Sequence, residues 1–362
     1  MMSDSLELAA GNKMKTILEK LTTNRFLGVI VGALITAVIQ SSSATTVMTV
    51  GFVNAGLMKL KNAVWIIMGA NIGTTITGQL IVIDISALAP LIAFVGVALI
   101  AFFKNKKLDM IGGIIAGLGI LFMGMDMMSG AMMPLRDSKE FVNIVSTFKN
   151  PLIGILVGAI FTAIIQSSSA SVGILIALAK SGVITLSSSI YVLFGQNIGT
   201  CITAVLASIG TSRNAKRTTI IHLSFNIIGT IIFVTISLLF PFADIVASLT
   251  PGNVPAQIAN VHTIFNIGTT ILLLPFGKQL VNLSYKLLPK RDEDIEIKKV
   301  KYLDKTIFVN DYHIGTSAIA NRQLFNEIQN MLTVAKTNLE MAFSILVNWD
   351  EKKFDKIIDT ED

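Results

Sequence analysis

The chain has 362 residues, of which 52% are hydrophobic and only 14% are charged. Soluble domains carry about 25% charged residues, so this composition excludes an ordinary soluble protein and predicts an integral membrane protein. The net charge of +6 does not indicate nucleic-acid binding, because lysines and arginines lie at the ends of apolar runs, where topology signals lie. The single cysteine, Cys201, excludes a disulfide within the chain.

The first half of the chain contains a broken apolar segment followed by three ordinary ones. Residues 26–56 are apolar but carry the polar sequence Gln-Ser-Ser-Ser at 40–43. A helix needs about 20 apolar residues to cross a bilayer. On this criterion three membrane spans follow, at residues 62–83, 88–103 and 110–129.

The second half has the same order. Residues 151–179 are apolar but again carry Gln-Ser-Ser-Ser, now at 166–169. The last residues are charged, and apolar side chains recur there at helical spacing over 324–345, which predicts an amphipathic helix. A second short helix is expected after Asp350. Between these parts, three membrane spans are predicted at residues 187–210, 218–240 and 261–276.

The two broken segments are copies of one another. Twelve of 18 positions are identical between residues 27–44 and 153–170, at an offset of 126 residues. In both copies Asn-Ile-Gly-Thr begins 31 residues after the glutamine. The offset also relates residues 1–3 to 127–129, which follow a predicted span. We therefore expect the natural protein to begin about 20 residues before this chain, with one further helix.

Each broken segment is predicted to form a re-entrant hairpin. Polar backbone at membrane depth must face protein or water, so a helix–break–helix that enters and leaves on one side is favoured. With two hairpins, most lysines and arginines fall on one face, which should be cytoplasmic. Three crossings then separate the hairpins, so the copies have inverted topology.

The predicted fold class is therefore an all-α membrane protein built from two inverted repeats, each with a re-entrant broken-helix hairpin. A short soluble helical segment follows. The predicted domains are membrane repeat one, membrane repeat two and a cytoplasmic segment, at residues 1–135, 136–288 and 289–362.

The polar breaks have the chemistry of an ion-binding site. A broken helix exposes N–H groups that attract anions and C=O groups that suit a hard cation. The tip of each hairpin is the polar break between its two helices. Two tips that face each other can hold a small tetrahedral oxyanion without a basic side chain. Cations bound beside the anion offset its charge. Serine and glycine also serve as packing residues between membrane helices. The repeated motif at a repeated spacing favours the binding site over packing alone.

These motifs resemble the type II sodium/phosphate cotransporters. The paired Gln-Ser-Ser-Ser motifs carry the resemblance, with Gly-Ala-Asn-Ile-Gly-Thr-Thr at 69–75 and Gly-Gln-Asn-Ile-Gly-Thr at 195–200. Gln196 stands where such motifs usually have a small residue. The resemblance implies phosphate binding by Ser41, Ser42, Ser43, Ser167, Ser168 and Ser169. It implies Na⁺ binding by Gln40, Thr74, Gln166, Ser167, Asn197, Thr200 and Thr203.

The leading interpretation is a secondary transporter in the cytoplasmic membrane that couples inorganic phosphate to Na⁺. Its expected partners are phosphate, Na⁺ and the lipid bilayer, with no nucleic acid; no cofactor is expected beyond Na⁺ as the coupling ion, and a homodimer is compatible with the sequence. The tail is similar to the start of the phosphate-uptake regulator PhoU. The alternatives are a phosphate exporter or uniporter with weak Na⁺ coupling, and a non-transporting phosphate sensor. An enzyme is disfavoured, because no acid or base adjoins the tip serines.

Overall fold

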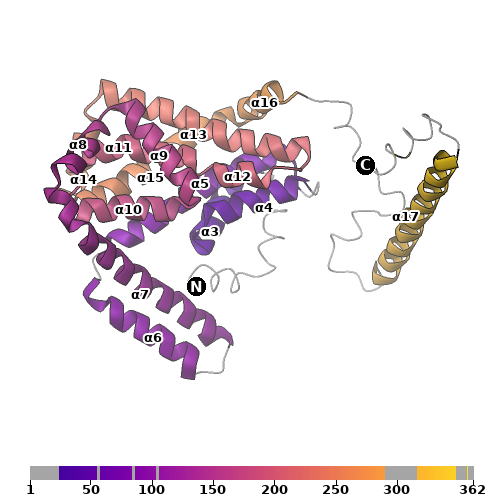
Figure 1. Cartoon of the computed structure of the whole chain (residues 1–362), viewed down its shortest axis with the longest axis horizontal. Coiled ribbons are helices and arrows are strands. Elements are labelled where there is room, and N and C mark those ends of the chain that lie inside the picture. The colour runs from indigo at the N-terminus through magenta and orange to yellow at the C-terminus, as the bar shows by residue number, and fades with distance from the viewer. Residues whose placement is uncertain are drawn as a thin grey trace. The chain divides into compact units, whose positions relative to one another are not determined.

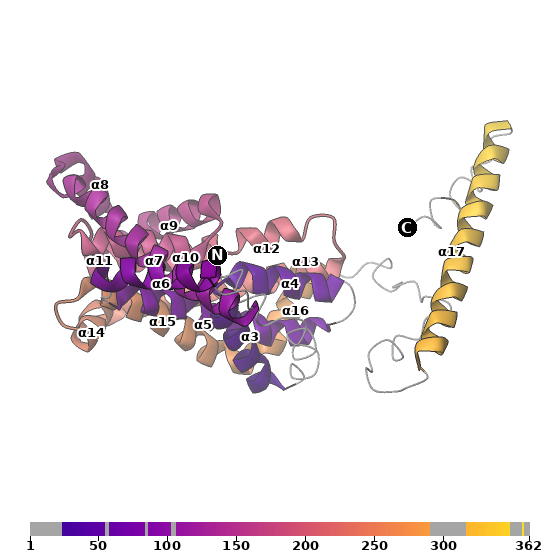
Figure 2. The ribbon, with the colours of Figure 1, turned by 90° about the horizontal axis from the view of Figure 1, so that it is seen from below.

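The computed structural model of the chain describes residues 24–54, 58–83, 86–102, 106–289, 316–347 and 357. The chain forms two compact units, Met1–Lys290 and Arg291–Asp362. Every regular element in the described residues is helical, as predicted for an all-α protein (Figures 1 and 2). The division of the first unit into repeats 1–135 and 136–288 stays a prediction.

The first broken segment folds back on itself. It consists of α3 (Arg25–Ile39) and α4 (Ser42–Asn54), followed by α5 (Leu60–Val82). Helices α3 and α5 pack closely: a Cβ atom on Gly28 would lie 2.6 Å from Trp65, and one on Gly73 would lie 2.5 Å from the Ala33 oxygen. Residues nearer the C-terminal end of α3 contact residues nearer the C-terminal end of α5, so the two helices run parallel. Helix α4 therefore returns the chain to the end at which α3 began.

The second broken segment repeats this arrangement with α9 (Pro151–Ile165), α10 (Ser168–Lys180) and α11 (Leu186–Gly199). A Cβ atom on Gly195 would lie 2.0 Å from the Ile155 carbonyl oxygen. A Cβ atom on Gly69, the position 126 residues earlier, would likewise overlap the carbonyl oxygen of Val29. The duplicated sequence therefore folds into duplicated helix packing.

The two hairpins approach each other from opposite ends of α5. Near the beginning of α5, the N–H of Ser212 donates to Oδ1 of Asn54 at the end of α4. Near the end of α5, a pocket is shared by Ile83 and by Lys180 at the end of α10. Figures 1 and 2 both show the α3–α4 hairpin on the right of the first unit and the α9–α10 hairpin to its left. The inverted topology across a membrane stays a prediction.

The remaining helices surround the hairpins. Helices α6 and α7 pack against each other and project from the rest of the first unit in Figure 1. Stacked rings of Phe194 and Phe265, 5.2 Å apart, form part of the core around α11. The bounds are α6 Ala89–Phe102, α7 Lys106–Met132, α8 Lys139–Thr147, α12 Ile202–Ala207, α13 Arg213–Leu239, α14 Phe242–Leu249, α15 Val254–Leu273 and α16 Gly277–Leu287, with short 3-10 helices at Ser86–Leu88, Met133–Asp137 and Leu274–Phe276.

Five helices of the described residues are long and apolar enough to cross a membrane, or six if α8 and α9, which meet at 104°, count as one bent span. This supports a multi-pass membrane protein. The predicted span over 187–210 is among the five, as Leu186–Ala207, although a tightened turn at Thr200 and Cys201 separates α11 from α12 within it. The predicted span over 88–103 forms a helix at Ala89–Phe102, whose 14 residues are fewer than a full crossing needs.

The outer surfaces of both hairpins are apolar. On α3 and α9, large hydrophobic side chains are exposed at every fourth position, which is the spacing of one helix face. In a membrane this stripe faces lipid or another chain. The exposed residues occupy matching positions in the two copies: Phe26, Ile30, Leu34 and Val38 on α3, and Leu152, Leu156, Ile160 and Ile164 on α9.

The second unit contains α17 (Thr316–Val347), which covers the predicted amphipathic helix. Its apolar side chains include Phe325 and Met331, which are exposed. Of the short helix expected after Asp350, only residue 357 is described, and it is helical. The likeness to PhoU stays a prediction.

Close helix packing leads to a stability prediction. Gly195→Ala would force α9 and α11 apart and is expected to lower the free energy of unfolding by about 1–3 kcal/mol. Gly124→Ala is the matched control, because a Cβ atom there meets no atom within 4 Å. Melting temperatures of the purified variants in detergent check this. Equal melting temperatures for both variants would show that the helices tolerate the extra carbon.

Candidate functional site

The tips of the two hairpins meet. The Oγ atoms of Ser42 and Ser168, which are equivalent positions in the two repeats, lie 3.3 Å apart in hydrogen-bond contact. Both side chains are buried, with 5% and 8% of their surface exposed. Each serine is the first residue of the returning helix, α4 or α10. The N-termini of two helices therefore face each other at a polar junction.

The glutamine of each motif makes the break. Gln40 and Gln166 have φ angles of 57° and 59°, and they are the only non-glycine residues with positive φ in the described residues. Their backbone N–H groups donate to the carbonyl oxygens of Thr36 and Thr162 and so end α3 and α9. Left-handed backbone is unfavourable for glutamine and is often found at functional sites. The same unusual conformation in both copies indicates that the tip backbone is a specific feature of the fold.

The first serine of each motif starts the returning helix. Ser41 Oγ accepts the N–H of Ala44 at 3.1 Å, and Ser167 Oγ accepts the N–H of Ala170 at 3.2 Å. This is the usual role of a serine N-cap. It leaves the other N–H groups of the first turn directed at the junction. These two serines therefore shape the tips as well as being candidate ligands.

The third serine of each motif bonds to the opposite repeat. Thr203 Oγ1 donates to Ser43 Oγ at 3.3 Å, and Ser169 Oγ donates to Thr77 Oγ1 at 3.4 Å. Thr77 is the position 126 residues before Thr203. Thr203 is among the site residues predicted from the sequence. Thr77 is not, although the offset of 126 residues identifies it. Each tip is thus held by a threonine of the other repeat.

The repeat-one glutamine joins this network. Thr77 Oγ1 donates to Gln40 Oε1 at 2.9 Å, and the amide nitrogen of Gln40 donates to the Ala37 oxygen. Gln166, its counterpart, is exposed. The two tips are therefore alike in backbone but differ at the glutamine side chain.

Three predicted cation ligands make hydrogen bonds to residues other than the tip serines. The hydroxyls of Thr74 and Thr200 donate to carbonyl oxygens one turn earlier, those of Ala70 and Gln196. Asn197 donates to Leu193 and accepts from Asn266 Nδ2 at 3.3 Å. The oxygens of both threonines still have a free lone pair for a cation.

A tightened turn lies beside these residues. The N–H of Cys201 donates to the Ile198 oxygen, three residues back, instead of the Asn197 oxygen four back. The Asn197 oxygen is left with the cysteine S–H at 3.8 Å. In repeat one, α5 continues without a break through the equivalent residues. The tightened turn exposes a backbone carbonyl in repeat two, where the resemblance implies a cation site.

The junction can hold an anion by neutral groups alone. Helices α4 and α10 each have 13 residues, and their N-termini carry partial positive charge. The serine and threonine hydroxyls add donors that can rotate toward an oxyanion. In the described residues, no group of three or more His, Cys, Asp or Glu side chains is placed to hold a metal ion.

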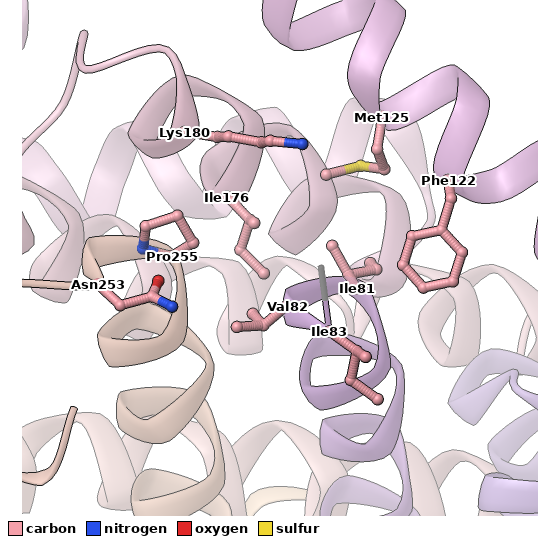
Figure 3. Close-up of a pocket in the computed structure, with 9 residues that line it drawn as sticks. All are labelled: Ile81, Val82, Ile83, Phe122, Met125, Ile176, Lys180, Asn253 and Pro255. Carbon is pink, nitrogen blue, oxygen red and sulfur yellow. The ribbon is translucent and has the colours of Figure 1, made fainter. Parts of the chain in front are cut away.

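A separate pocket of about 190 Å³ lies at the end of α5 (Figure 3). Its rim carries Lys180, which forms a 2.8 Å ion pair with Asp126, and Asn253. The other lining residues are apolar, so the interior does not suit a phosphate ion. They are Ile81, Val82, Ile83, Phe122, Met125, Ile176 and Pro255.

Comparison with known proteins identifies the family of the chain. Residues 1–130 and 135–249 match the family model described as Na⁺/Pi-cotransporter. The chain is 32% identical over 296 residues to "Uncharacterized protein YqeW" of Bacillus subtilis, covering 80% of this chain and 92% of that protein. No solved structure gives a significant match.

Two other relatives have names that state an activity. "Putative inorganic phosphate export protein YjbB" of Escherichia coli is 26% identical over 316 residues, covering 86% of this chain. This chain spans 56% of that protein's length. "Sodium-dependent phosphate transport protein 2B" of Homo sapiens is 26% identical over 212 residues, covering 54% of this chain and 29% of that protein.

Proposed function

Because this chain belongs to the Na⁺/Pi-cotransporter family, we propose that it carries inorganic phosphate across the cytoplasmic membrane, coupled to Na⁺, at the junction of the two hairpin tips. The contact between Ser42 and Ser168 carries this proposal. It brings equivalent positions of both repeats, and the N-termini of two helices, to one point. Phosphate binding would replace that hydroxyl contact with bonds from each serine to the anion.

The phosphate ligands in this proposal are the six motif serines. Ser42 and Ser168 donate from the centre, and Ser43 and Ser169 donate from pairs that link the repeats. Ser41 and Ser167 orient the first turns of α4 and α10. Since the anion is held by neutral donors, a bound cation is needed to offset its charge at low dielectric.

The proposed Na⁺ ligands are the oxygens beside the tips. In repeat two these are Gln166, Ser167, Asn197, Thr200 and Thr203; in repeat one they are Gln40 and Thr74. Anion and cation attract each other, so each should raise the affinity of the other by the same factor. No catalytic residue and no cofactor is part of this proposal.

The function is tested by uptake of radiolabelled phosphate into vesicles containing the purified chain. We expect uptake that an inward Na⁺ gradient accelerates and that choline in place of Na⁺ does not support. Vesicles without protein are the control. Phosphate flux that ignores the Na⁺ gradient would overturn the coupling, and absence of both flux and phosphate binding would overturn the transport proposal.

Export is the second candidate function, favoured by the printed name of the Escherichia coli relative. The same vesicles distinguish direction if they are loaded with phosphate and Na⁺ is varied on each side. Efflux driven without a Na⁺ gradient would favour the exporter.

We also propose that the beginning of α5 and the chain's C-terminal segment face the cytoplasm. The beginnings of three helices, α3, α5 and α16, lie at this side. They carry Arg25, Lys61 and Lys278 around one cavity of about 670 Å³. Arg217 Nε donates to the Leu288 oxygen and so holds the end of α16 at the same side. A basic face is cytoplasmic in most membrane proteins.

Cysteine labelling checks the orientation in a Cys201→Ser background. A membrane-impermeant maleimide added to intact cells should label Pro251→Cys, in the turn before α15, and should leave Lys59→Cys unlabelled until the cells are opened. Labelling of both positions from outside would contradict the two-hairpin topology.

A further inference from the structure

Three buried oxygen atoms lie one helical turn behind the repeat-two tip. They belong to Thr162 on α9, Ser171 on α10 and Gln196 on α11, whose side chains are between 0% and 2% exposed. Thr162 Oγ1, Ser171 Oγ and Gln196 Oε1 have no hydrogen-bond partner. A buried polar atom without a partner is rare and calls for a water, an ion or a functional role.

The three residues converge at one depth. The backbone carbonyl oxygen of Thr162 accepts the N–H of Gln166, and the backbone N–H of Ser171 donates to the carbonyl oxygen of Ser167, so both residues lie one turn from the break. Gln196 reaches across from α11, because its Nε2 donates to the Ser171 carbonyl oxygen at 3.1 Å. That bond fixes the amide and leaves Oε1 as the atom without a partner. We refer to Thr162, Ser171 and Gln196 as the oxygen layer.

Repeat one closes the same layer differently. Thr36 and Thr45 occupy the positions equivalent to Thr162 and Ser171, and their hydroxyls bond directly to each other at 2.9 Å. Ala70 stands in place of Gln196. In repeat one, therefore, the two hydroxyls bond to each other. In repeat two the equivalent hydroxyls have no bond between them, and an amide oxygen is added.

The ligand chemistry of the oxygen layer favours a cation. The helix dipoles oppose each other there, because Thr162 lies in the last turn of α9, which carries partial negative charge, and Ser171 lies in the first turn of α10, which carries partial positive charge. All three unpartnered atoms are oxygens, which are the ligands that hard cations prefer. Simple packing does not explain them, since hydroxyls such as those of Thr218 and Thr235 bond to carbonyl oxygens of their own helix.

We propose that Thr162, Ser171 and Gln196 form a site for a small monovalent cation such as Na⁺, present in repeat two alone. All three residues lie outside the set of ligands proposed above, so this site is a second position one turn behind the repeat-two tip. The inference rests on the proposed use of Na⁺, and its test is a binding measurement that needs no transport.

The test measures the Na⁺-dependent rise in melting temperature of the purified full chain, with choline as the replacing ion and no phosphate present. Ser171→Ala and Gln196→Ala, which copies repeat one, should each raise the half-maximal Na⁺ concentration about tenfold, the equivalent of roughly 1.4 kcal/mol. Thr45→Ala in repeat one is the matched control. It should lower the melting temperature at every Na⁺ concentration and leave the half-maximal concentration unchanged.

Two outcomes would overturn the site. An unmutated chain whose melting temperature ignores Na⁺ holds no such cation, and unchanged half-maximal concentrations in both repeat-two variants would show a buried water only. Vesicle uptake separates this failure from failure of the proposed function. Uptake that stays Na⁺-dependent while both variants bind Na⁺ normally would reject the oxygen layer and leave the transport proposal standing.

Discussion

Alanine at Ser42 or Ser168 should weaken phosphate binding by about 1–3 kcal/mol for each substitution, because each removes one hydroxyl donor from the anion. The two hydroxyls contact each other at 3.3 Å. Their effects should therefore not add in the double variant. The expected measurement is a half-maximal phosphate concentration for uptake raised about five- to 150-fold.

The control for this experiment is Ser284→Ala. Ser284 is fully buried on α16, and its hydroxyl donates only within that helix. It should change neither uptake nor phosphate affinity. If the Ser42 and Ser168 variants transport with unchanged affinity as well, the two serines serve packing and the proposed site is wrong.

Joining the two tips covalently should stop transport. With cysteine at positions 42 and 168 in a Cys201→Ser background, oxidation is expected to form a disulfide, since the native Oγ atoms lie within 3.3 Å. A disulfide holds its sulfurs about 2.05 Å apart, which leaves no room for phosphate between the tips. Oxidised protein should lose uptake, and a reducing agent should restore it.

Each single cysteine variant under the same oxidant is the control. Its uptake, measured at saturating phosphate because the serine hydroxyl is lost, should be the same before and after oxidation. Cross-linking is followed by a mobility change in a gel after cleavage of the chain between the repeats. Uptake at the normal rate by fully cross-linked protein would mean that the tips need not separate for phosphate to pass.

The breaks at the two tips were predictable because the sequence states them twice. Polar residues at 40–43 and 166–169 interrupt apolar runs, and no continuous membrane helix accommodates them without partners. The left-handed backbone of Gln40 and Gln166 was not predictable, because glutamine has no preference for that conformation. It follows from the closure of the hairpin, which only the folded chain imposes.

The hydrogen bonds between the two repeats were not predicted, for a different reason. Motif spacing identified residues within one copy, whereas Thr77 is selected by its contact with Ser169 from the other copy. Applying the offset of 126 to Thr203 would have found it. Chemistry that depends on two segments meeting needs either the structure or the symmetry rule.

Helix lengths near the membrane surface were the least predictable. The amphipathic helices α8 and α14 have nine and eight residues, and a search for long apolar runs passes over both. The beginning of α6 was predicted to within one residue, at 88 against Ala89, because an apolar run marks it.

The crosswise pairs, Thr203 with Ser43 and Ser169 with Thr77, mean that neither repeat can complete its own tip. A single repeat made as a separate polypeptide would need a second copy to satisfy the same hydroxyls. Fusion into one chain makes that pairing permanent. It also frees the two halves to diverge, and the difference between Ala70 and Gln196 at one matched position is such a divergence.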